Sequence, residues 1–73
     1  MTLDKVPCGQ CVRICRICGA GAIRRRLMDM GLVKGVSIEV LRSAPLGDPI
    51  AYRLRGYQLA LRKSEAQLIE VEA

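Results

Sequence analysis

Two segments of the chain alternate between apolar and polar residues, which is the pattern of strands with one buried face. These segments are residues 11–18 and 36–42. In the first of them, Ile17 falls out of phase with Ile14. A slip of one residue moves the following side chains to the opposite face of a sheet. We therefore predict a bulge or bend near Cys15.

Between these two strands the apolar period becomes helical. Ile23, Leu27 and Met30 occur at i, i+4 and i+7, which places them on one face of a helix over residues 21–30. Gly31 follows directly. Glycine just beyond a helix commonly adopts the left-handed conformation that ends it, so we expect the helix to stop here.

The second half of the chain predicts a hairpin. Two prolines around Gly-Asp exclude regular pairing in residues 45–49, so this segment is expected to be a loop. Residues 50–55 and 58–62 are predicted strands on either side of a two-residue turn. A type II′ turn needs glycine at its first loop position, so we expect Gly56 and Tyr57 to form the tip.

The end of the chain predicts one helical turn and a last strand. Residues 64–67 have the Ser-x-x-Gln form of a capping box, with Ser64 as the cap, and residues 68–72 follow as a strand. Five short strands in so short a chain favour a small barrel over a two-layer sandwich. The predicted fold is mainly β: one domain over residues 1–73, an SH3-like, five-stranded, partly open barrel. It has one helix between strands 1 and 2 and a short helical turn before the last strand.

Composition adds a positive charge and a location. The 73 residues include 12 Lys and Arg against 7 Asp and Glu, giving a net charge of +5. Such an excess of positive charge is typical of proteins that bind nucleic acid or an acidic membrane surface, so both are considered as partners. Tyr52 and Tyr57 are the only aromatic residues, which weakens the nucleic-acid alternative because base stacking needs aromatic platforms. No apolar run approaches the roughly 20 residues that span a bilayer, and residues 1–5 carry no export signal, so we expect a cytoplasmic protein.

The sequence offers little for catalysis. It contains no histidine, and its acidic residues are scattered. Neither Gly-x-x-x-x-Gly-Lys nor Gly-x-Gly-x-x-Gly opens a helix. We therefore expect a protein that is not an enzyme and has no required cofactor.

Four cysteines near the N-terminus form two Cys-x-x-Cys pairs separated by three residues: Cys8, Cys11, Cys15 and Cys18. Cys-x-x-Cys is the spacing that places two thiolates on one zinc or iron ion. A strand over residues 11–18 rises about 3.3 Å per residue, so its ends lie roughly 20 Å apart and cannot share one ion. A barrel and a single four-cysteine site are thus alternatives within one chain, although a site at Cys8 and Cys11 remains open.

Two further interpretations of the cysteines stay open. They can serve as small apolar residues, one or two of them buried. They can also be exposed thiols that bind a metal between molecules or respond to redox state. A reducing compartment argues against disulfides.

Several stretches closely resemble the ferrous iron transport protein A (FeoA) family. They include the helix ending in Asp-Met-Gly-Leu, the Gly-Asp-Pro loop and the Gly-Tyr-x-Leu-Ala-Leu-Arg hairpin, and together they cover most of residues 22–62. The resemblance implies an SH3-like barrel, a cytoplasmic location and a non-catalytic accessory role. It also implies association with the cytoplasmic GTPase part of a FeoB-type ferrous iron transporter. The cysteines are the main departure from the family pattern.

We expect the partner-binding surface to consist of large side chains placed where packing does not demand them. These are Arg24, Arg25, Met28, Leu46 and Tyr57. The same residues are equally consistent with an ordinary solvated helix face and loop tips. Open strand edges can also pair between chains, so a homodimer is a further expectation.

Overall fold

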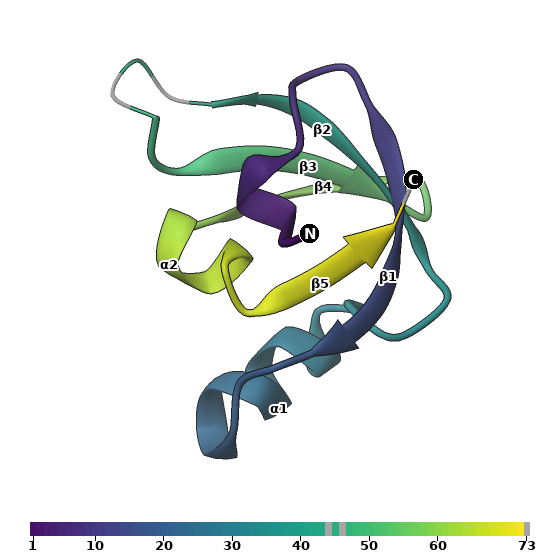
Figure 1. Cartoon of the computed structure of the whole chain (residues 1–73), viewed down its shortest axis with the longest axis vertical. Helices are drawn as coiled ribbons and strands as arrows, with labels where there is room; N and C mark the ends of the chain where they lie inside the picture. Colours follow the sequence, from purple (N-terminus) through teal and green to yellow (C-terminus); the bar gives the residue numbers. More distant parts are fainter. Residues whose placement is uncertain (44, 46, 73) are drawn as a thin grey trace.

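The computed structural model describes residues 1–43, 45 and 47–72. Five antiparallel strands form one sheet in the order β4-β3-β2-β1-β5, which coils into a barrel that is not closed between β4 and β5 (Figure 1). The predicted mainly β, partly open barrel is confirmed. In chain order, the elements are a 3₁₀ helix η1 (Leu3–Lys5), β1 (Cys11–Ile17), α1 (Gly21–Asp29), β2 (Ser37–Ser43), β3 (Ile50–Leu54), β4 (Tyr57–Leu61), α2 (Lys63–Ala66) and β5 (Ile69–Glu72).

Strand β1 contains the predicted bulge. Its pairing with β5 shifts register between Ile14 and Arg16. The extra residue, Cys15, returns Ile17 to the inner side of the strand, where it pairs with Ile69 and packs against the core. The out-of-phase isoleucine in the sequence is thus explained by a bulge.

The core consists of aliphatic side chains and Tyr52, and it draws on every strand. Leu3 and Val6 of the N-terminal segment are also buried in it. Before η1, the carbonyl of Met1 accepts a hydrogen bond from the backbone N–H of Val71, at 2.8 Å. The chain therefore begins by packing along β5, a contact that the sequence pattern did not predict.

Helix α1 ends at the predicted glycine. Leu27 on its apolar face is fully buried. Gly31 has φ +94°, and its N–H donates to the carbonyl of Met28 at 3.0 Å. The N–H of Leu32 donates to the carbonyl of Leu27 at 3.2 Å. These two bonds form a Schellman motif, which satisfies helix carbonyls that would otherwise lack partners.

The predicted hairpin exists, but its turn is one residue earlier than expected. Arg55 and Gly56 are the central turn residues, with φ of +50° and +83°. Positive φ at both positions is the requirement of a type I′ turn, whose twist matches that of the two strands, so the predicted type II′ turn is wrong. Tyr57 is not a tip residue: it begins β4 and pairs with Leu54.

The helical turn before β5 also begins earlier than predicted. Arg62 is the residue that caps α2, so the predicted cap at Ser64 is wrong. The carboxylate of Glu65 accepts the backbone N–H of Arg62 at 2.9 Å. A carboxylate three residues into the helix satisfies the cap N–H, which is the glutamate half of a capping box.

Candidate functional site

The outward face of α1 carries three of the five residues predicted to bind a partner. Arg24, Arg25 and Met28 are exposed, and Met28 retains 39% of its accessible surface. Together with Gly21 and Asp29 they line a shallow hollow of about 360 Å³. Residues at these spacings share one face of a helix, so the grouping follows from the helical period.

The charges on α1 divide between two faces. The guanidinium of Arg26 donates to the carboxylate of Glu65, which is only 6% exposed. This contact joins α1 to α2. Within the described part of the chain, the ion pairs involve Arg16, Arg26 and Arg53, and neither Arg24 nor Arg25 forms one. The rim of the hollow around Met28 therefore carries two arginines and one carboxylate, that of Asp29, with an excess of positive charge.

Tyr57 lies at the C-terminal end of the same helix. Its hydroxyl donates to the carbonyl of Met30, and 43% of the residue remains exposed. A Cβ built on Gly31 would lie 2.8 Å from that hydroxyl oxygen. The contact fixes the β3–β4 hairpin against α1 and brings Tyr57 to the helical turn that follows Met28. Leu46, the fifth predicted residue, lies outside the described residues.

The four cysteines are distributed along β1. Cys8 and Cys11 are exposed at its start, Cys15 is half-buried at the bulge, and Cys18 is exposed beyond its end. Because none is buried, the interpretation of one or two cysteines as core residues is wrong. In residues 1–43, 45 and 47–72, no three Cys, Asp or Glu side chains are grouped so that they could hold a metal ion.

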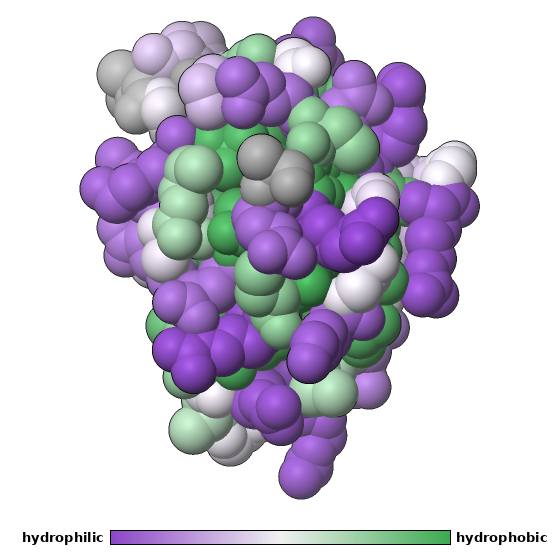
Figure 2. Space-filling model, turned by 45° about the vertical axis from the view of Figure 1, so that its right-hand side comes forward, coloured by the Kyte–Doolittle hydropathy of each residue, from purple (hydrophilic) through white to green (hydrophobic). Residues whose placement is uncertain are grey.

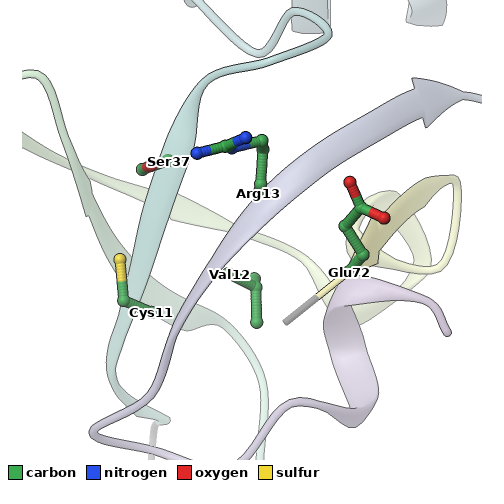
Figure 3. Close-up of a pocket in the computed structure, with 5 residues that line it drawn as sticks. All are labelled: Cys11, Val12, Arg13, Ser37 and Glu72. Carbon is green, nitrogen blue, oxygen red and sulfur yellow. The ribbon is translucent and has the colours of Figure 1, made fainter.

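A second hollow, of about 250 Å³, lies on the outer side of β1 (Figure 3). Arg13 pairs in register with Ser37 of β2 and with Glu72 of β5. Its side chain extends toward β2, while that of Glu72 lies on the other side of β1. Cys11 also borders the hollow, but its sulfur does not point toward the carboxylate. A catalytic site requires polar groups that converge on one point, and these groups do not.

The surface is largely hydrophilic on the face drawn in Figure 2, and hydrophobic atoms show between the polar side chains. None of the helices in the described residues is long and apolar enough to cross a membrane. Exposed large hydrophobic residues in this part of the chain are Met1, Met28 and Tyr57. Two of these three belong to the surface formed by α1 and the start of β4, which we call the helix surface: Arg24, Arg25, Met28 and Tyr57.

An open, five-stranded antiparallel barrel with a helix between its first two strands defines the chain as a small SH3-like domain. The family model described as "FeoA domain" matches residues 1–73. The chain belongs to the FeoA family.

Solved structures support this assignment. A FeoA-like protein from Clostridium acetobutylicum is 49% identical, with a TM-score of 0.92 over 99% of this chain and 84% of that one. The FeoA of Stenotrophomonas maltophilia, crystallised with zinc and described as a prokaryotic SH3 domain protein, is 30% identical. Its TM-score is 0.87, and the match covers 99% of this chain and 89% of that one.

A curated relative links the family to a transporter. An Fe(2+) transport protein A/Fe(2+) transporter FeoB fusion protein from Porphyromonas gingivalis is 42% identical over 72 residues, or 99% of this chain. The chain spans only 8% of that relative's length. In that protein, the FeoA part and the transporter belong to one polypeptide.

Proposed function

We propose that residues 1–73 act as one non-catalytic domain that docks on the cytoplasmic part of a FeoB-type ferrous iron transporter and modulates its assembly or transport. Two observations support this. The chain belongs to a family associated with ferrous iron transport, and in one relative the two parts are fused. Fusion of two parts in a relative is expected when the separate chains work together at one place. Docking places the protein in the cytoplasm.

The proposed docking site is inferred from Met28, whose exposed side chain lies in a hollow with Arg24 and Arg25 at its rim. An exposed flexible apolar side chain surrounded by charges resembles the centre and rim of a protein interface. Arginine adds hydrogen bonds to carboxylates and is enriched at interfaces. The partner's matching surface is therefore expected to be apolar at its centre and acidic around it.

A binding assay with the purified cytoplasmic domain of the transporter tests this proposal. Met28→Asp and Arg25→Glu should each weaken binding at least tenfold. Arg42→Glu is the matched control, because it makes the same charge change on an exposed residue of β2 that does not line the hollow around Met28. Equal binding by all three variants and the unaltered protein would exclude the helix surface.

A second candidate function is soft-metal binding by Cys8 and Cys11. Both thiols are exposed. Cys8 lies within a turn in which the N–H of Gln10 donates to the carbonyl of Pro7 at 3.4 Å, and Cys11 directly follows that turn. The related FeoA from S. maltophilia was crystallised with zinc. Zinc or iron would take these thiolates as two of its ligands.

Cobalt titration under anaerobic, reducing conditions tests the metal proposal. Thiolate-to-cobalt absorption bands should saturate and disappear when Cys8 and Cys11 are changed to Ser, but persist when Cys15 and Cys18 are changed. Bands that survive the change of all four cysteines would rule out a thiolate site. One metal per two chains would mean that two copies share it.

A further inference from the structure

The two edges of the open sheet differ. Strands β4 and β5 lie at the ends of the strand order. The edge of β5 is covered by the start of the chain, through the bond from Val71 to Met1 and a bridge between Thr2 and Glu70. Within the described residues, β4 pairs only with β3. The outer edge of β4 is therefore the unpaired edge of this sheet.

The register identifies which backbone groups face outward on that edge. Leu54 and Tyr57 flank the two-residue turn, where the flanking residues form a hydrogen-bonded pair. Hydrogen-bonded and non-bonded pairs alternate along an antiparallel ladder. Leu59 and Leu61 consequently bond to β3 like Tyr57, and the N–H and C=O groups of Gln58 and Ala60 point away from it. Both of these residues are exposed.

Strand β4 lacks the usual protection of an edge. Natural edge strands carry charged residues, proline or a bulge, which prevent pairing with another chain. The sequence Tyr-Gln-Leu-Ala-Leu has no charge and no proline, and its five pairs with β3 run without a register shift. We infer that the β4 edge, independently of the helix surface, binds an extended segment of another polypeptide by strand addition.

The charges around β4 indicate what that segment is. Arg55 lies at the hairpin end, and Arg62 and Lys63 lie at the other end, all of them exposed. In the described part of the chain, none of these three side chains forms an ion pair. The carboxylate of Asp48 accepts the backbone N–H of Lys63 at 2.9 Å and offsets the charge at that end only in part.

A second copy of the chain is a poor occupant. Antiparallel pairing centred on Leu59 joins Gln58 of each copy to Ala60 of the other and uses all the outward groups. The same register places Arg55 of one copy opposite Lys63 of the other, and two chains of charge +5 repel. The occupant that fits is an extended segment of alternating residues with acidic residues at both ends.

A designed peptide tests this inference. The probe has five alternating Val and Thr residues between pairs of Glu, and the control peptide has Lys in place of Glu. In the ¹⁵N-labelled protein, the Glu peptide should shift the amide signals of Gln58 and Ala60 saturably at millimolar concentration. It should also slow their hydrogen exchange, and the Lys peptide should bind at least tenfold more weakly.

Two variants at one position separate the backbone contact from the side chain. Ala60→Pro removes an outward N–H and no bond to β3, so it should weaken the peptide at least tenfold. Ala60→Val keeps the N–H and should bind like the unaltered protein. Unchanged β3 amide signals show that each variant is folded. If Ala60→Pro does not fold, the slowed hydrogen exchange of Gln58 and Ala60 in the unaltered protein tests the inference instead. Equal binding of both peptides, no binding, or pairing of two copies through β4 would each overturn the inference.

Discussion

The hydroxyl of Tyr57, the first residue of β4, donates a hydrogen bond to the carbonyl of Met30 at the end of α1. This bond joins two residues that are 27 positions apart in the sequence. Gly31 lies against the hydroxyl group of Tyr57, because any Cβ there would be only 2.8 Å from the hydroxyl oxygen. The end of the helix and the hairpin therefore depend on each other, and the helix surface is held in one arrangement.

The contact predicts non-additive effects of two substitutions. Tyr57→Phe removes one partly exposed hydrogen bond and should lower the free energy of unfolding by about 0.5–1 kcal/mol. Gly31→Ala should cost more than about 1 kcal/mol, because φ is +94° and the new methyl group meets the hydroxyl. The double variant should lose less than the sum, since Phe removes the clash. Urea unfolding measures all three, and strict additivity would contradict the contact.

Glu65 is predicted to be the most sensitive charged residue. It is buried, and its carboxylate accepts from Arg26 and from the backbone N–H of Arg62. Glu65→Ala should lower the free energy of unfolding by about 2 kcal/mol, because it removes the cap and both bonds.

The Arg26 side of this contact should matter less. The side chain of Arg26 is 58% exposed, so water can replace its guanidinium and screens the ion pair. Arg26→Ala should lower the free energy of unfolding by about 1 kcal/mol or less. Glu65→Gln keeps an acceptor for the N–H of Arg62, so its loss should lie between those of Arg26→Ala and Glu65→Ala. A larger loss for Arg26→Ala than for Glu65→Ala would show that the ion pair, and not the cap, dominates.

Tyr52 should make the protein sensitive to alkali. Burial, with the negative charges of Asp4 and Cys8 adding to it, raises the pKa of Tyr52 well above its ordinary value of 10.0. Above about pH 10 the unfolded chain loses this proton while the folded protein keeps it, so stability falls as pH rises. Below that pH this group adds no pH dependence.

Replacement of Tyr52 tests that expectation. Its hydroxyl is buried and has no hydrogen-bond partner among the described residues. Tyr52→Phe should therefore leave stability at pH 7 unchanged or raise it by about 1 kcal/mol, and should flatten the decline above pH 10. A loss of stability at pH 7 together with an unchanged alkaline decline would show that the hydroxyl is bonded and that other groups titrate.

The hairpin turn can be improved. Arg55 has φ +50°, which is uncommon for residues other than glycine, asparagine and aspartate. Asn-Gly is strongly preferred in type I′ turns, so Arg55→Asn should raise the free energy of unfolding by about 0.5 kcal/mol. Arg55→Val, with a branched side chain, should lower it. The opposite order in thermal unfolding would contradict the turn type.

Local patterns predicted most of the fold, and their failures share a physical cause. Ile17 marked the bulge and Gly31 the end of α1, because each depends on its immediate neighbours. The predicted turn lies one residue later than the observed turn at Arg55 and Gly56, because either register places a glycine in the loop. The burial of Leu3 could not be predicted from the sequence pattern, because a helix of three residues is too short to show a period.

The candidate site was partly predictable for the same reason. The exposure of Met28 follows from the helical period alone, which places this residue opposite the buried stripe. The bonds from Tyr57 to Met30 and from Arg26 to Glu65 join residues 27 and 39 positions apart. Contacts at that separation depend on tertiary packing and have no sequence pattern of their own.

Docking on the transporter is proposed to occur through the helix surface. Its most direct test is a titration of ¹⁵N-labelled protein with the unlabelled cytoplasmic domain of a FeoB-type transporter, following the backbone amide signals. Docking through the helix surface should give saturable changes concentrated at Arg24, Arg25, Met28 and Tyr57, and these changes should be lost in Met28→Asp. Saturable changes confined to β1 and the cysteines, or no change at concentrations where the domains would meet in a cell, would contradict it.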